Sequence, residues 1–150
     1  MSAGKPARSG RLGALSGLVL ATAFSSIALA TPAQAATTRN GVCDPGEFCL
    51  YYNSNRAGSV SDFTSSIANY GSSQPGCYVF VGSGAGRGLC VKNNAASVWN
   101  RTGGTVEIYY NSYYGGSVQG FGPGLSGNLA PFIKNNNASH RLNAPGISGT

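Results

Sequence analysis

Hydrophobic residues alternate with other residues over short segments of the chain, as they do in β-strands. The alternation covers residues 48–51 (FCLY) and 106–109 (VEIY), and both segments are rich in aromatic and β-branched side chains. A period of two with this composition predicts strands. A third strand is predicted at 77–81 (CYVFV), between Pro75-Gly76 and a glycine-rich stretch. Because glycines recur in the links, where hairpins need positive φ, we expect an all-β sandwich.

The chain also contains an internal repeat. Residues 50–63 (LYYNSNRAGSVSDF) and 108–121 (IYYNSYYGGSVQGF) share eight of fourteen positions, at an offset of 58. Residues 92–97 (KNNAAS) and 134–139 (KNNNAS) share five of six, at an offset of 42. We therefore expect two copies of one motif, at about 46–100 and 105–143. The first copy carries 16 more residues, between its two shared segments.

The first 35 residues have the features of a signal peptide. Three basic residues lie at positions 5, 8 and 11, an almost uncharged run follows at 12–30, and Ala33-Gln34-Ala35 is a small-x-small cleavage pattern. An uncleaved anchor is the alternative, but no stop-transfer flank follows the run. We expect a secreted, extracellular protein with one mature domain, 36–150, and no membrane segment in that form.

Net charge argues against a nucleic-acid partner. The full chain has a formal charge of +6. Without the first 35 residues, seven basic and four acidic residues remain, so the charge falls to +3. The remaining basic residues are scattered along the sequence, and no cluster of them would follow a phosphate backbone.

Four cysteines lie in the expected mature chain, at positions 43, 49, 77 and 90. An exported chain with an even number of cysteines is typical of disulfide bonding. Three connectivities are open, and short separations favour Cys43 with Cys49 and Cys77 with Cys90. A zinc site is the competing interpretation, but the chain has a single histidine and no Cys-x-x-Cys pair.

The strand pattern also predicts which residues form the core and which segments are only loosely attached to it. We expect loose ends at 36–42 and 144–150. The predicted core residues are Phe48, Leu50, Val60, Phe63, Val106, Ile108, Val118 and Phe121.

Each copy resembles the βγ-crystallin Greek-key motif. In both copies a tyrosine is followed seven positions later by a glycine, and a serine comes later in the motif. The resemblance implies that the aromatic residue packs on a folded hairpin, that the glycine adopts a backbone conformation closed to other residues, and that the serine ties the hairpin down. Arg56 stands in the first copy where the second has an aromatic residue. The signature residues are Tyr51, Gly58, Ser97, Tyr109, Tyr114, Gly116 and Ser139.

The chain is more closely similar to peptidase inhibitor family thirty-six, which includes exported bacterial metalloproteinase inhibitors with a βγ-crystallin fold. The shared features are the signal peptide, the cysteines before and within FCLYYNS, the following GS, and KNNAAS. They span Cys43 to Asn143. The resemblance implies an inhibitor that binds a secreted peptidase, and we expect this protein to be a monomer.

The insertion of the first copy is the expected inhibitory contact, because a disulfide-bounded loop on a β scaffold loses little chain entropy on binding. Its large apolar side chains suit the specificity pockets of metallopeptidases. The alternative is that 77–81 is only the third strand of the motif, which would leave loop residues near Arg87 as the contact. The candidate residues are Tyr78, Val79, Phe80, Val81 and Arg87.

Catalysis would require a group that transfers protons or attacks a substrate. Besides His140, the mature chain offers four carboxylates, Asp44, Glu47, Asp62 and Glu107, and we expect each of them at the surface. The sequence suggests no serine or cysteine partner for the histidine. We therefore predict a protein that is not an enzyme and has no cofactor.

Calcium is the remaining candidate ligand. Many microbial βγ-crystallins bind it through two Asn or Asp residues, two variable residues, Ser or Thr, and Ser. The corresponding segments here, NNAASV and NNNASH, have Val98 and His140 in place of the final serine and contain no acid. Since calcium prefers hard oxygen ligands, we expect weak binding or none, with the asparagines forming turns.

Two further functions remain open beside inhibition: a calcium-binding or structural extracellular protein of the crystallin type, and a wall, carbohydrate or antimicrobial binding module. Four tyrosines of the second copy bear on the latter. The crystallin signature assigns Tyr109 and Tyr114 to internal packing, which leaves Tyr110 and Tyr113 for solvent or a partner.

Overall fold

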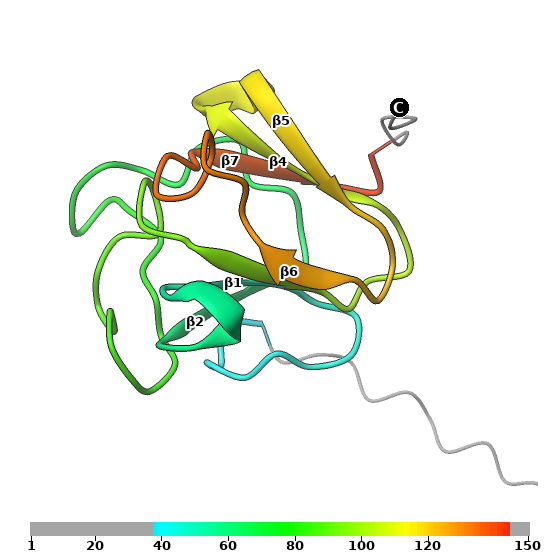
Figure 1. The fold of residues 1–150 in the computed structure, drawn as a ribbon. Helices are drawn as coiled ribbons and strands as arrows, with labels where there is room; N and C mark the ends of the chain where they lie inside the picture. Colours follow the sequence, from blue (N-terminus) through cyan, green and yellow to red (C-terminus); the bar gives the residue numbers. More distant parts are fainter. Residues whose placement is uncertain (1–37, 145–150) are drawn as a thin grey trace, which may run out of the picture. The chain divides into compact units, whose positions relative to one another are not determined.

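Two antiparallel sheets form the fold, which is that of a sandwich (Figure 1). The computed structural model describes residues 38–144, so the expected signal peptide lies outside the described residues. One sheet has the order β2-β1-β3-β6, with strands Val60–Phe63, Phe48–Tyr51, Ser97–Asn100 and Ser126–Asn128. The other has the order β5-β4-β7, with strands Gly115–Phe121, Val106–Asn111 and Ser139–Leu142. Within 38–144 no helix has the length and apolarity that a membrane crossing needs.

The two copies of the repeat exchange a segment, as Greek-key motifs do. The first copy supplies β1, β2 and β3, and the short strand β6 of the second copy pairs with β3 at the edge of that sheet. In return, Ile67 of the first copy forms an antiparallel bridge with His140 in β7. Each sheet therefore contains chain from both copies, so the predicted sandwich of two Greek keys is confirmed.

A folded hairpin joins the first two strands of each copy. The 3-10 turns η1 (Ser54–Arg56) and η2 (Ser112–Tyr114) occupy equivalent positions. In the first hairpin, Ser97 accepts a hydrogen bond from the Arg56 amide at 2.9 Å and donates one to the Asn53 carbonyl at 2.6 Å.

Ser139 makes the same two bonds in the second hairpin, with the Tyr114 amide at 3.1 Å and the Asn111 carbonyl at 2.7 Å. The glycines that end the turns, Gly58 and Gly116, have φ of +74° and +76°. At these values a side chain would be strained, as the crystallin signature implies.

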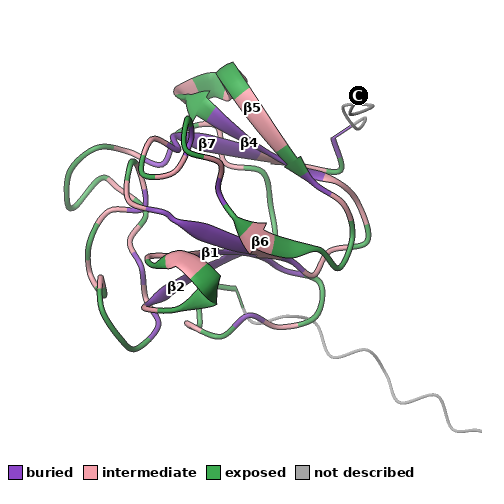
Figure 2. Ribbon diagram, in the orientation of Figure 1, coloured by how far each residue is buried: buried purple, intermediate pink, exposed green. Residues whose placement is uncertain are grey.

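The core lies between the two sheets, and Figure 2 shows its buried strands in purple. Six of the eight predicted core residues belong to it. Val118 is only partly buried, because β5 lies at the edge of its sheet, and that prediction was wrong. Val60 is buried in a smaller cluster with Cys43 and Cys49, on the other side of its sheet. The core also contains residues that strand alternation did not indicate: Tyr70, Phe80, Val91, Leu129 and Ile133.

The segment before β1 is tied to the fold, contrary to the expectation that 36–42 would be loose. The backbone amides of Asn40 and Gly41 donate to the carboxylate of Asp62 at 2.9 and 3.0 Å. Arg39 donates to the Val79 carbonyl at 2.6 Å, and its guanidinium lies 4.8 Å from the centre of the Phe63 ring. A buried carboxylate thus fixes residues 39–41, and the predicted loose end at 145–150 lies outside the described residues.

Candidate functional site

The insertion of the first copy forms a loop closed by the Cys77–Cys90 disulfide. The structure also contains the Cys43–Cys49 disulfide, so both pairs are those favoured by sequence separation. Residues 77–81 do not form a regular strand, and that prediction was wrong: an isolated bridge pairs Val79 with Cys90. The pairing does not extend along the segment, because the backbone amides on either side bond to other segments. The Tyr78 amide donates to the Tyr70 carbonyl, and the Val81 amide donates to the Val60 carbonyl.

The rest of this loop is held against the first hairpin. The Ser59 hydroxyl donates to the Gly82 carbonyl at 2.5 Å, and the Ser59 amide donates to the Ala85 carbonyl at 2.8 Å. Gly86, with φ of +87°, lies against the face of the Tyr52 ring, where an added Cβ would come within 2.2 Å of Cγ. The glycines therefore allow close approach to the body of the protein. We call residues 77–90, with their disulfide, the clamped loop.

The clamped loop exposes some of the predicted contact residues and buries one. Tyr78 is 38% exposed, and Arg87 is exposed as well. Phe80 is fully buried, in edge-to-face contact with Tyr52 at 5.8 Å, so its assignment to the contact surface was wrong. Val79 and Val81 are partly buried. Sequence reasoning missed Leu89, which is 46% exposed and lies beside the disulfide. An apolar residue preceding Cys90 was its only signal.

The carboxylates do not lie where the sequence predicted. Glu47, Asp62 and Glu107 are buried, and only Asp44 is half-buried. Asp62 accepts the two backbone amides described above, and Glu107 accepts the Tyr109 hydroxyl. The Glu47 Oε2 accepts the Asp44 amide at 2.7 Å, while burial raises the pKa of Glu47. Strand periodicity cannot indicate these hydrogen bonds, and the buried Glu47 Oε1 has no partner among the described residues.

His140 is also buried, in contact with the aromatic core. Its Nδ1 lies 2.8 Å from the Tyr70 hydroxyl and its Nε2 lies 2.9 Å from the Ser65 carbonyl. Its ring centre is 4.8 Å from those of Phe48 and Phe63. Burial lowers the pKa of His140 to about 3, so the ring is neutral at ordinary pH. Both ring nitrogens are engaged internally, which describes a core histidine.

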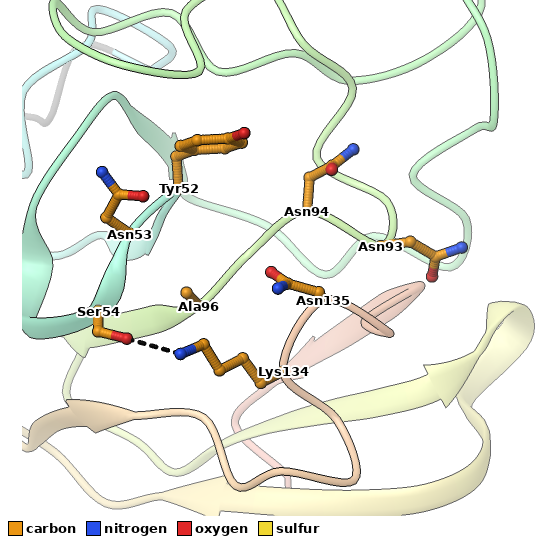
Figure 3. Close-up of a pocket in the computed structure, with 8 residues that line it drawn as sticks. All are labelled: Tyr52, Asn53, Ser54, Asn93, Asn94, Ala96, Lys134 and Asn135. Carbon is orange, nitrogen blue, oxygen red and sulfur yellow. Dashed lines mark hydrogen bonds between the residues drawn. The ribbon is translucent and has the colours of Figure 1, made fainter.

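A polar pocket of about 320 Å³ lies where the first asparagine segment meets the first hairpin (Figure 3). Among the residues that line it are Asn53, Asn93 and Asn135, all exposed and without a side-chain hydrogen bond. Lys134 also lines the pocket, and its ammonium donates to the Ser54 hydroxyl at 2.8 Å. None of the lining residues is acidic. Within residues 38–144, no group of three or more His, Cys, Asp or Glu is arranged to hold a metal ion.

The tyrosines of the second copy fall into a packed pair and an exposed pair, as the resemblance implied. Tyr109 and Tyr114 pack against each other at 5.7 Å, and Arg141 lies 4.5 Å from the centre of the Tyr114 ring. Tyr110 and Tyr113 are 44% and 75% exposed. They leave exposed aromatic side chains at the second hairpin.

The family is decided by a match over residues 36–121, more than half of the chain, to the model of peptidase inhibitor family I36. The chain belongs to this family. The matched region includes both disulfides and the whole clamped loop. Membership supports an inhibitor role and a peptidase as the kind of partner, and a non-catalytic protein is the corresponding expectation. No curated protein matches the chain.

The fold is shown by one solved structure. The chain is similar to a structure from "Evolution of the eye lens beta-gamma-crystallin domain fold", at TM-score 0.50 and 14% identity over 65% of this chain and 85% of that one. It is also similar to a βγ-crystallin from an Archaea, at TM-score 0.46 and 20% identity over 66% and 99% of the two chains. The N-terminal domain of protein S matches at TM-score 0.47 and 20% identity, over 67% and 99%.

Proposed function

We propose that the chain is a secreted inhibitor of a metallopeptidase, which it blocks by binding through the exposed part of the clamped loop. Family membership supports the inhibitor role. The observation that carries the proposal is the clamp itself: a disulfide, a β-bridge and the Ser59 bonds fix a loop from which Tyr78, Arg87 and Leu89 project.

The clamp favours inhibition because binding a peptidase usually requires a segment to become ordered. A loop that is already fixed loses less conformational entropy on binding, so more of the contact energy appears as affinity. Tyr78 and Leu89 supply the large apolar side chains that metallopeptidase specificity pockets accept. Large anchor residues of this kind commonly carry most of the binding energy of an interface.

The first test is a panel of secreted metallopeptidases and serine peptidases, assayed with the purified mature protein. We expect inhibition of at least one metallopeptidase at a one-to-one ratio. Inhibition of serine peptidases alone would contradict the target class. No inhibition across the panel would contradict the proposed function, and binding to isolated cell wall or to glycans would then support the alternative of a binding module.

The contact is tested with variants of the exposed residues. Tyr78→Ala and Leu89→Ala should each weaken inhibition about tenfold or more, as for anchor residues. Leu125→Ala is the matched control, because Leu125 is 58% exposed and lies in the β5–β6 loop, away from the clamped loop (Figure 1). Equal inhibition by all three folded variants would place the contact elsewhere.

A further inference from the structure

Two lysines connect the copies of the repeat in the same way. The Lys134 ammonium, from the second copy, donates to Ser54 in the first hairpin at 2.8 Å (Figure 3). The Lys92 ammonium, from the first copy, donates to Ser112 in the second hairpin at 3.1 Å. These residues are related by the offsets of the repeat, 42 for the lysines and 58 for the serines. The cross-copy contact is therefore present twice.

Each lysine directly precedes one of the asparagine segments that resemble the calcium segments of βγ-crystallins. The residues present do not fit calcium. The pocket beside the first segment is lined by amides, by the hydroxyl-bearing residues Tyr52 and Ser54, and by Lys134, and none of its lining residues has a carboxylate. Calcium prefers several hard oxygen ligands, usually with carboxylates among them, and a fixed ammonium in the same pocket repels it.

We propose that Lys92 and Lys134 are built-in cations, which connect the asparagine segment of one copy to the hairpin of the other and make the fold independent of calcium. A charged donor makes a stronger hydrogen bond than a neutral one. The ammonium is covalently attached, so the contact does not depend on the concentration of a free ion. Asn93 and Asn135 then remain as turn residues, with φ of +62° and +58°.

The contact is tested first by removing the charge. Lys92→Met and Lys134→Met should each lower Tm by about 5 °C, the shift that the loss of one such interaction gives in a domain of this size. Arg87→Met is the matched control: it removes one exposed positive charge whose side chain has no hydrogen bond among the described residues, and it should leave Tm unchanged. Tm values of the lysine variants equal to that of the control would overturn the proposal.

The second test adds calcium ligands with and without the lysine. Asn93→Asp with Asn135→Asp places two carboxylates in the pocket while Lys134 is retained, and Lys134→Ala is then added to that pair. We expect 5 mM Ca²⁺ to raise Tm by several degrees in the triple variant only. A response of the double variant as large as that of the triple variant would overturn the proposal, and so would no response of the triple variant.

The unmodified protein gives a readout that does not depend on how the variants fold. Its Tm should be the same in 5 mM Ca²⁺ and in chelator, and its lysine ¹H–¹⁵N NMR signals should not move during a calcium titration. A rise of many degrees, or a calcium-dependent shift of the Lys134 signal, would show that the cation competes for the pocket and would overturn the proposal.

Discussion

At the scale of single residues, Asp62 and His140 are held inside the described chain by hydrogen bonds to segments distant in sequence. Asp62 holds two backbone amides, and His140 holds the Tyr70 hydroxyl and the Ser65 carbonyl. A buried polar group costs free energy unless it is bonded, so removing a partner destabilises more than the bond itself stabilises. These groups therefore fix particular contacts between segments of the chain.

His140 gives the clearest dependence on pH. Its pKa in the folded protein is about 3, below the ordinary value of 6.5. Because the folded state binds this proton less tightly than the unfolded state, the contribution of His140 is full above pH 6.5 and is lost as pH falls towards 3. Over this window the free energy of unfolding should fall by about 1.4 kcal/mol for each pH unit on account of this residue.

The measurement is urea unfolding between pH 3 and 7, for the native protein and for His140→Gln. The variant is less stable at pH 7, but its curve should lack the slope due to His140. Glu47, whose raised pKa acts in the opposite direction, is present in both proteins and cancels in the difference. Parallel curves for the two proteins would contradict the prediction.

At the scale of elements, each hairpin has an arginine packed on an aromatic ring, but the two residue types occupy exchanged positions in the two hairpins. In the second, the aromatic Tyr114 lies on the turn and Arg141 on the strand, 4.5 Å from its ring. In the first, Arg56 lies on the turn and Trp99 on the strand, at 4.7 Å. Trp99 also contacts Arg101 at 4.5 Å. Arg56 thus replaces the signature aromatic residue without loss of the cation–π contact, which is why the first hairpin folds like the second.

The stability of the clamped loop depends on Gly86, which lies against the Tyr52 ring of the first hairpin. Gly86→Ala should lower the free energy of unfolding by about 3 kcal/mol, since a Cβ would overlap the Tyr52 ring and φ is +87°. Gly88→Ala is the matched control. Its φ is +83°, but nothing lies within 4 Å of an added Cβ, so only the backbone strain of about 1 kcal/mol applies. Denaturant unfolding compares the two, and equal losses would show that the Tyr52 contact is unimportant.

The sequence predicted some of these elements and not others, for physical reasons. Strand alternation and the repeat located β1 and β4, because successive side chains of a strand point to opposite faces of its sheet. The same rule failed at residues 77–81, whose backbone bonds are divided among three segments, near Tyr70, Val60 and Leu89. It also failed at Glu47 and Asp62, which are buried by hydrogen bonds to neighbouring turns. The sequence located the candidate site only through its cysteines, and the sole signal for Leu89 was an apolar residue directly before Cys90.

At the scale of the whole molecule, the two disulfides constrain different segments of the fold. Cys43–Cys49 ties the incoming chain to β1, next to Val60 and Trp99. Cys77–Cys90 closes the clamped loop, which lies against the first hairpin. Since the exchanged segments already join the two copies, neither bond is needed to hold the sandwich together. We therefore expect each to be separable from the fold and to affect function differently.

Removing each bond by paired alanine substitutions tests this. The chain-entropy model gives a loss of about 3 kcal/mol for Cys77→Ala with Cys90→Ala, and about 2.4 kcal/mol for Cys43→Ala with Cys49→Ala. The stability losses are similar, yet only the first pair frees the loop that we propose as the contact. Under conditions where both variants are folded, the first should lose at least tenfold in inhibition and be cleaved by the target peptidase, while the second inhibits like the native protein. An equal loss of inhibition would show that general stability, and not the clamp, determines binding.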